Sequence, residues 1–330
     1  MDRRAIAFFV LASLFFGGTF VAAKAGLEYF SPLLFVAIRF DVAAIVLLGY
    51  VLVTHSREEL LPTTRGDLVG IFATGALVIG LTNALLFVGQ QYATSAVAAI
   101  VFSLNPILTP VFAAVLLSDE RLSLRGAVAM GLGLVGVALV VGPDTATLLG
   151  GDALGRAILF AGTVSASLGA VLIRRADAPL SSTVRIAWGL PLAAILCHGF
   201  ARAAGETTAA IAWTPAALVA LGYVSIVAGV FAYIAYFALL DEAGAIRSSL
   251  LFYVVPVVST VGGWAILGER IELVTVAGFL TIFAGFAVLG SASIDLDDLD
   301  VRSKLPGVPT TSPAAEDRSA CEEPQGFRSD

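Results

Sequence analysis

Residues 91–106 read QYATSAVAAIVFSLNP, and residues 241–256 read DEAGAIRSSLLFYVVP. The two stretches lie 150 positions apart, and three residues are identical in both: Ala93 and Ala243, Phe102 and Phe252, Pro106 and Pro256. Each stretch leads into an apolar run that ends in a Glu-Arg pair, at Glu120 in the first and Glu269 in the second. Self-similarity at a fixed period indicates a duplicated unit. The sequence therefore predicts two copies of one module of about 150 residues.

The composition is that of a membrane protein rather than a water-soluble globule. Of the 330 residues, 58% are apolar and 13% are charged, about half the charged share of an average soluble domain. The mean hydropathy is +0.94. Because a helical span needs roughly 20 mostly apolar residues, this composition can supply about nine or ten spans. Apolar windows bounded by charge, proline or glycine predict ten helices, at residues 5–24, 32–53, 68–91, 95–117, 125–142, 154–173, 181–200, 215–240, 245–267 and 273–291.

The first apolar segment allows two interpretations. The charged start Asp2-Arg3-Arg4, followed by apolar residues 5–23, also fits a secretory signal peptide. Further apolar runs continue as far as Ser291, so the segment is more simply the first of many membrane helices.

Five of the predicted helices fall in each copy, which gives a first repeat over residues 1–145 and a second over 150–291. An odd number of spans makes the second copy enter the membrane from the opposite side, so the repeats are inverted about an axis in the membrane plane. In such folds the cavity between the copies opens to either face in turn, which is alternating access. The predicted fold class is an all-α integral membrane protein of ten helices in two inverted five-helix repeats.

Lysine and arginine are unevenly shared between the two sides that this topology predicts. Four face the side opposite the termini: Lys24, Arg156, Arg202 and Arg270. Eleven face the side of the termini: Arg3, Arg4, Arg57, Arg65, Arg121, Arg125, Arg174, Arg175, Arg247, Arg302 and Lys304. Positive residues near helix ends tend to stay in the cytoplasm. We therefore expect a multi-pass protein of the plasma membrane with both termini in the cytoplasm.

The C-terminal residues 292–330 differ from the rest in composition. From Ser291 to Asp330 there are nine Asp or Glu against four Lys or Arg, so this segment carries -5 of the chain's net charge of -6. It also contains four prolines and no apolar periodicity. Such a segment cannot bury enough apolar surface to offset the entropy of ordering. We expect a disordered, acidic cytoplasmic tail.

Several classes of function are disfavoured. Outside the tail the chain is close to neutral, so no basic surface indicates binding to nucleic acid. The two cysteines and two histidines, His55 and His198, are too few and too scattered for a disulfide framework or a metal centre. The glycines at 131, 133 and 136 spell G-x-G-x-x-G, but inside an apolar helix this spacing favours close helix packing over a dinucleotide cofactor. We expect neither a metal nor a cofactor.

The order of these features resembles the EamA-type proteins of the drug/metabolite transporter superfamily. The resemblance covers residues 6–290 and rests on the segments 16–24 (FGGTFVAAK), 31–33 (SPL) with 37–40 (AIRF), 93–96 (ATSA), the mid-helix prolines and the paired Glu-Arg motifs. Two features depart from the family pattern: Phe16 stands where the family often has Trp, and the opening helix of the second copy is eroded over 163–174. The resemblance implies a ten-helix secondary carrier, commonly an exporter of small metabolites.

Ionisable residues inside a span are candidates for function, because a charge at membrane depth is costly. Arg39 and Asp41 lie about 10 to 14 Å into the second predicted helix at 1.5 Å per residue. Arg39 is a candidate contact for an anion or carboxylate, with a structural ion pair or a snorkelling position as the alternative. Asp41 is a candidate for proton coupling, since burial favours the protonated form of a carboxylate. Lys24, with Glu28 four residues on, is expected to be an interfacial anchor.

Uncharged polar residues at midplane depth are further candidates to line a central cavity. They are Asn83, Ser103, Asn105, Tyr233, Tyr236 and Tyr253. Each could instead make a hydrogen bond between helices. Pro106 and Pro256 remove backbone donors near mid-span, so they are candidate kinks that either widen the cavity or only bend the helix. Glu120 and Glu269 at span ends are candidate caps or gates.

These features predict a secondary active transporter, a permease or exporter, that moves a small metabolite or drug-like solute across the lipid bilayer by alternating access. Proton coupling is a further hypothesis. The alternatives are a channel or a non-transporting scaffold, which an inverted repeat disfavours, and an intramembrane enzyme. The sequence has no H-E-x-x-H and no G-x-S-x-G motif, so we do not expect an enzyme. A monomer and a homodimer are both compatible with the sequence.

Overall fold

The computed structural model describes residues 3–116, 151–233 and 251–285, together with the helical residues 128, 131–133, 135–136, 139, 235–236, 239 and 287–288. Within these ranges the regular secondary structure is helical, with no strand. All of them belong to one compact unit, residues 1–293. The predicted disorder of 292–330 falls outside the described residues, as does most of the fifth predicted helix, 125–142.

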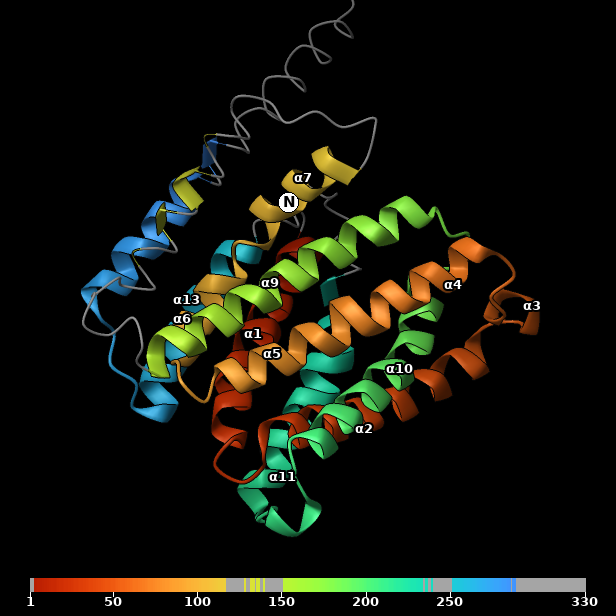
Figure 1. The fold of residues 1–330 in the computed structure, drawn as a ribbon, viewed down its shortest axis with the longest axis horizontal. Helices are drawn as coiled ribbons and strands as arrows, with labels where there is room; N and C mark the ends of the chain where they lie inside the picture. Colours follow the sequence, from red (N-terminus) through yellow and green to blue (C-terminus); the bar gives the residue numbers. More distant parts are fainter. Residues whose placement is uncertain are drawn as a thin grey trace, which may run out of the picture. The chain divides into compact units, whose positions relative to one another are not determined.

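The first copy contains four of its predicted spans among the described residues (Figure 1). Two are single helices, α1 (Arg3–Gly26) and α2 (Pro32–Thr54), with the short α3 (Arg57–Leu60) after them. The third span is continuous but mixed, with α4 (Arg65–Phe72), the π-helical η1 (Ala73–Leu81) and α5 (Thr82–Gly89). The fourth is divided into α6 (Ser95–Phe102) and α7 (Asn105–Leu116).

The second copy follows the same plan. Its helices are α9 (Gly151–Ala176), α10 (Ser182–Ala203), the 3-10 turn η2 (Thr208–Ala210), α11 (Pro215–Gly222), the π-helical η3 (Tyr223–Phe231), α13 (Leu251–Leu267) and a last helix, Leu273–Gly285. In the described part of the chain, six helices are long and apolar enough to span a membrane. They are Arg3–Gly26, Pro32–Thr54, Arg65–Gly89, Ser95–Leu116, Ala153–Ala176 and Ser182–Ala203, and shorter apolar helices cover Pro215–Phe231, Val254–Leu267 and Leu273–Gly285.

The ends of the helices follow from local sequence. Pro32 and Pro215 occupy the first turns of α2 and α11, where a missing N–H leaves no bond unmade. Thr94 caps α6, because its hydroxyl accepts from the backbone N–H of Val97. Thr214 and Ser181 cap α11 and α10 in the same way. These are the small polar residues that favour helix starts.

The two copies share an irregularity that hydropathy did not predict. The π-helical segments, Ala73–Leu81 and Tyr223–Phe231, occupy equivalent positions, 150 residues apart. The α-helical segments that lead into them, Arg65–Phe72 and Pro215–Gly222, keep the same offset. A π turn inserts residues into the regular hydrogen-bond ladder and is frequent at functional sites. The duplication therefore extends to the local backbone of the third span.

Two hydrogen bonds between the copies show at which end of the packed helices each connection lies. Beside the start of α2, the backbone N–H of Ala212 donates to Tyr29 O at 3.1 Å, so the connection after α1 lies next to the connection after α10. Beside the start of α10, the N–H of Leu180 donates to Asp67 Oδ1 at 3.1 Å, so the first turn of α4 lies next to the connection after α9. The matching connections α1–α2 and α9–α10 thus lie at opposite ends of the packed helices.

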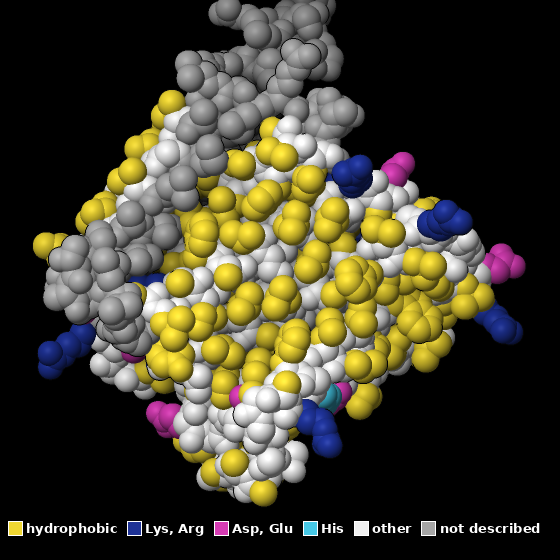
Figure 2. Space-filling view, in the orientation of Figure 1, with side chains coloured by type: hydrophobic (Ala, Val, Ile, Leu, Met, Phe, Trp, Pro, Cys, Tyr) yellow, Lys and Arg dark blue, Asp and Glu magenta, His cyan; other side chains and the backbone are white. Residues whose placement is uncertain are grey.

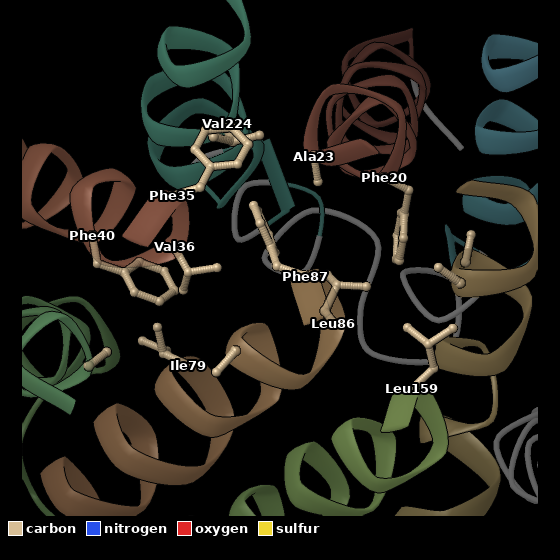
Figure 3. Close-up of a cluster of buried hydrophobic side chains, with 14 of the residues drawn as sticks. Phe20, Ala23, Phe35, Val36, Phe40, Ile79, Leu86, Phe87, Leu159 and Val224 are labelled. Carbon is tan, nitrogen blue, oxygen red and sulfur yellow. The ribbon is translucent and has the colours of Figure 1, made fainter. Parts of the chain in front are cut away.

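Packing between the copies comes in matched pairs. α1 packs on α13 and η3, and α9 packs on α6, α7 and η1. Figure 1 shows α10 alongside α2, a further contact between the copies. In the interior, the ring of Phe35 stacks on Phe30 at 4.6 Å and meets Phe87 edge-on at 5.2 Å between ring centroids. Figure 3 shows Phe35 and Phe87 together with Val224 and Leu159, so side chains from both copies form one core.

The outer surface is apolar over a wide area. On the face shown in Figure 2, hydrophobic side chains cover most of the helices, while Lys, Arg, Asp and Glu lie near its margins. Exposed side chains include Val53, Leu273 and Val115, which are 87%, 84% and 76% exposed. Soluble monomers rarely leave such large apolar areas in water. In a bilayer, by contrast, lipid tails cover them and helices satisfy the backbone internally.

Candidate functional site

A cavity of about 300 Å³ lies between the two copies. This volume is at the lower end of the range of small-molecule sites. Its aromatic lining is Phe16, Phe20, Phe40, Phe102, Tyr233 and Tyr236. Its polar lining is Thr19, Arg39, Thr82, Asn83, Ser103 and Asn105. Since residues of both copies form the wall, a relative movement of the copies changes the cavity.

Six of the seven residues proposed from the sequence as substrate contacts line this one cavity. They are Arg39, Asn83, Ser103, Asn105, Tyr233 and Tyr236. Their positions span nearly two hundred residues of sequence, and the fold brings them together. The side chain of Tyr253 lies outside the described residues. Contact with a substrate remains a prediction for all seven.

Arg39 is the charged side chain of the cavity wall. It is 6% exposed, and its Nη1 donates to Asn83 Oδ1 at 3.2 Å. The guanidinium carbon lies 5.0 Å from the ring centroid of Phe40 and 5.5 Å from that of Phe87, within the range of cation–π contacts. Its Nε is buried without a hydrogen-bond partner. Among the described residues no carboxylate pairs with Arg39, so its charge has no counter-ion in the cavity.

The hydroxyl groups of the threonine and serine residues of the wall donate to backbone carbonyls. Thr19 donates to Phe15 O at 3.0 Å, Thr82 to Leu77 O at 2.7 Å, and Ser103 to Ile100 O at 2.6 Å. A buried hydroxyl without a partner is costly, so these bonds stabilise the spans. Each of these three hydroxyls thereby has its one donor engaged with the backbone.

Asn105 joins two spans. Its Oδ1 accepts from Thr109 Oγ1 at 3.1 Å and from Ser167 Oγ at 2.8 Å, which connects α7 to α9 of the other copy. This is the interhelical hydrogen bond that the sequence left open as the alternative for Asn105. The carboxamide oxygen is therefore occupied by protein donors.

Phe16 forms the aromatic side of the cavity and was not among the predicted site residues. Its ring meets Tyr233 at 5.3 Å and Tyr236 at 6.2 Å in edge-to-face contacts. Phe20 meets Phe102 in the same way at 6.0 Å. The one sequence signal was the departure from the family pattern at Phe16. The structure places that departure on the cavity wall.

Asp41 lies outside the cavity, although burial was the reason for proposing it as a proton site. Its Oδ2 lies 2.8 Å from Nε2 of His198, and both side chains are 45% exposed. The reason is helix geometry: residues two apart differ by about 200° around the axis, so Asp41 points away from Arg39. No His, Cys, Asp or Glu lies three or four residues from His198 in its own helix. Its partner comes from α2, which no local spacing reveals.

Glu269 joins the two copies at the end where α1 finishes, and Lys24 joins spans of the first copy at the same end. Glu269 accepts from the backbone N–H of Ser95 at 2.9 Å and from its hydroxyl at 2.7 Å, so it caps α6 of the other copy. Lys24 Nζ donates to the carbonyl oxygens of Gln90 and Ala93. Glu120 lies outside the described residues.

The two prolines proposed as kinks lie in different surroundings. The fourth span is interrupted at residues 103–104, and Pro106 is the second residue of α7, where its missing N–H costs little. Pro256 lies within α13, and its carbonyl accepts from Thr260 Oγ1 at 2.8 Å. The irregularity expected at Pro106 is therefore a two-residue turn between α6 and α7, directly before the proline. A role in gating remains a prediction for both.

The model of the EamA-like transporter family matches the sequence twice, over residues 3–142 and 153–291. The chain belongs to the EamA-like transporter family. This confirms the resemblance read from the sequence motifs. The EamA chain is therefore a multi-pass membrane protein of a transporter family, and membership favours transport over catalysis.

Relatives of this EamA protein carry transporter names at low identity. "Uncharacterized transporter YyaM" of Bacillus subtilis (strain 168) is 28% identical over 83% of this chain and 89% of its own length. An "Uncharacterized transporter" of Archaeoglobus fulgidus is 26% identical over 84% and 96%. "Uncharacterized inner membrane transporter YedA" of Escherichia coli (strain K12) is 24% identical over 78% and 81%.

The fold also matches a solved structure. A chain titled "Crystal structure of protein" superimposes with a TM-score of 0.60, covering 86% of this chain and 96% of its own. The two sequences are 21% identical, so the likeness concerns the fold alone.

Proposed function

We propose that the protein is a secondary carrier that moves a small organic solute across the inner, cytoplasmic membrane by alternating access. The observation that carries this proposal is the cavity walled by both copies of the repeat. A cavity at the interface of two repeats is where transporters of this architecture bind solute. The transporter family and the name of the E. coli relative agree with it.

The carrier is proposed to have ten spans in two inverted repeats. The opposite placement of the matching connections α1–α2 and α9–α10 supports inversion. The matched packing of α1 on α13 and of α9 on α6 and α7 supports a two-fold relation between the copies. The excess of Arg and Lys on the side of the termini supports cytoplasmic termini.

The contact between Glu269 and Ser95 is proposed to be the outer gate. It joins α6 of one copy to the residues after α13 of the other, at the end assigned to the cell exterior. Ser259 Oγ adds a second link, since it donates to Ser95 O at 2.9 Å. Opening the cavity toward this end separates α6 from α13, so these hydrogen bonds must break and re-form in each cycle.

A disulfide across this gate tests alternating access. A Cβ added at Gly263 would lie 2.4 Å from Ser95 Oγ, so cysteines at 95 and 263 are close enough to be bridged. We expect the oxidised Ser95→Cys/Gly263→Cys protein, in a background with Cys197→Ser and Cys321→Ser, to lose uptake into proteoliposomes. Reductant should restore the uptake. The assay uses a labelled mixture of amino acids, nucleobases, sugars and carboxylates as solutes.

Each single-cysteine variant is the matched control, and its uptake should be the same after oxidant as after reductant. Undiminished uptake by the cross-linked protein would exclude alternating access through this end. Absence of uptake from every form, with folded protein in the vesicles, would favour the scaffold.

Proton coupling is proposed to use the Asp41–His198 pair. The imidazole and the carboxylate can both carry a proton, and they lie 2.8 Å apart. The pair lies at the contact of α2 with α10, which belong to different copies. Asp41→Asn is expected to flatten the pH dependence of uptake, and His198→Gln should do the same. An unchanged profile in both variants would remove the pair from the mechanism.

A further inference from the structure

We propose that the cavity selects organic monoanions, a carboxylate on an apolar or aromatic body, and that Arg39 holds the carboxylate. This inference rests on the proposed function, because it names the class of solute for the same cavity. It starts from a charge balance. Among the described lining residues, Arg39 carries a charge and no Asp, Glu, His or Lys accompanies it. A bound anion would supply the missing counter-charge.

The buried charge is expensive without such a ligand. An ionised group taken out of water loses hydration, and a partner must restore the interaction. The nearest acid on the same helix, Asp41, is engaged with His198 on another face. The neutral Asn83 Oδ1 is the acceptor that Arg39 does have. Arg39 therefore behaves as one half of an ion pair whose other half is absent from the described residues.

The guanidinium is held in place for a ligand. The rings of Phe40 and Phe87 lie within cation–π distance of it. Asn83 is itself fixed, because its Nδ2 donates to Ile79 O at 2.8 Å and so turns Oδ1 toward Arg39. An arginine fixed in this way can offer two parallel N–H groups to a carboxylate, which gives direction as well as charge.

The rest of the wall restricts the ligand to one negative charge. One cation balances one anionic charge, and a dianion such as a phosphate monoester would leave an excess. An ammonium group would be repelled by Arg39 and would find no carboxylate among the described lining residues. The remaining surface is aromatic and aliphatic, with the rings of Phe16, Tyr233 and Tyr236 in contact. Such a surface suits an apolar body.

Probes that share a phenyl ring and carry different head groups test the inference. The full chain in detergent is titrated calorimetrically with phenylacetate, phenylacetamide, 2-phenylethylammonium and phenyl phosphate. We expect phenylacetate to bind at least about tenfold more tightly than the amide, the size of effect of a hydrogen-bonded charge. The ammonium probe and the dianion should bind more weakly than phenylacetate. Equal binding of acid and amide, or tighter binding of the ammonium probe, overturns the inference.

Variants test whether Arg39 is the source of the preference for the acid over the amide. Arg39→Gln should remove the tenfold difference between acid and amide, and Arg39→Lys should retain part of it, because lysine keeps the charge but lacks the planar fork. Arg202→Gln removes the same charge from an exposed position near the end of α10 and should leave the preference intact. A full preference in Arg39→Gln contradicts the assignment. If that variant does not fold, the wild-type probe series and Arg39→Lys still decide.

Binding and uptake separate this inference from the proposed function. A carboxylate preference in titration with no uptake into proteoliposomes would refute transport and leave the anion site standing. Uptake of a neutral or cationic solute at equal rates by wild type and Arg39→Gln would refute the anion site and leave transport standing.

Discussion

The two copies of the repeat share a backbone but not a chemistry. The π-helical segments η1 and η3 match position for position, and so do the helices before them. The polar residues of the cavity, however, come from the first copy. Their counterparts 150 residues on are apolar or aromatic: Arg39 matches Gly189, Asn83 matches Tyr233, Asn105 matches Val255 and Thr19 matches Gly169. A symmetric scaffold can thus move an asymmetric site.

Packing explains one of these differences. A Cβ added to Gly75 in η1 would lie 2.5 Å from the carbonyl oxygen of Gly189, so the two backbones cross in close contact. Small residues allow membrane helices to approach in this way. A Cβ added to Gly189 would lie 3.1 Å from the backbone N of Gly75, so close packing favours glycine in the second copy at the position that carries Arg39 in the first. In the second copy this position serves helix packing through Gly189, and in the first copy it serves the cavity through Arg39.

The largest expected effect comes from filling that crossing. Gly75→Ala should lower the free energy of unfolding by about 2–3 kcal/mol, because the methyl group meets backbone rather than a movable side chain. Thermal unfolding of the purified protein in detergent measures the change. Gly49→Ala is the matched control, since nothing lies within 4 Å of a Cβ there. Equal stability of both variants would show that the close crossing does not constrain the second copy.

The next effect is expected at the gate between the copies. Glu269→Gln weakens two hydrogen bonds to Ser95 that a carboxylate accepts, and should cost about 2 kcal/mol of stability. Glu272→Gln removes the same charge three residues on, at an exposed side chain, and should cost nothing measurable. Chemical unfolding monitored by tryptophan fluorescence compares them. Identical midpoints would contradict a stabilising link at this end.

A smaller effect should separate the matched residues Asn83 and Tyr233. Asn83→Ala removes the acceptor that orients Arg39 and should raise the Kd for phenylacetate about fivefold, the value of roughly 1 kcal/mol. Tyr233→Phe keeps the ring that contacts Phe16 and should change the Kd less than about twofold. Calorimetric titration gives both constants. A larger loss from Tyr233→Phe would place the recognition chemistry in the second copy.

The smallest effect is expected at Asp41. Its pair with His198 is half-exposed, and ion pairs of that kind contribute at most about 1 kcal/mol. Asp41→Asn should therefore leave the unfolding temperature nearly unchanged while altering the pH profile of uptake. A strongly destabilised Asp41→Asn protein would instead make the pair a structural link between α2 and α10.

The sequence predicted the positions of the spans because apolar windows reflect the thickness of the membrane. The predicted helices 32–53 and 181–200 correspond to Pro32–Thr54 and Ser182–Ala203. It did not predict η1 or η3, because a π turn depends on how neighbouring helices pack and has no composition of its own. The turn at residues 103–104 was anticipated only as a candidate kink at Pro106, because residues 95–117 are apolar enough overall to form one predicted span.

The residues of the cavity were partly predictable. A polar or charged side chain at membrane depth is costly, so Arg39, Asn83 and Asn105 could be proposed as inward-facing from position alone. Aromatic residues give no such signal in an apolar helix, and Phe16 was missed as a wall residue. The partner of Asp41 was missed because it lies 157 positions away, and pairing at that separation is decided by tertiary structure.

The π-helical segments have a mechanical consequence for the cavity. Each ends two residues before a wall residue, η1 before Asn83 and η3 before Tyr233. If the backbone of a π-helical segment loses one inserted residue, the helix that follows it rotates by about 100° around its axis. A relaxation of η1 to ordinary α-helix would swing Asn83 off Arg39, and the same change in η3 would swing Tyr233 off Phe16. A change within one helical turn would then be enough to break the contacts that hold a solute, and no helix would have to unfold.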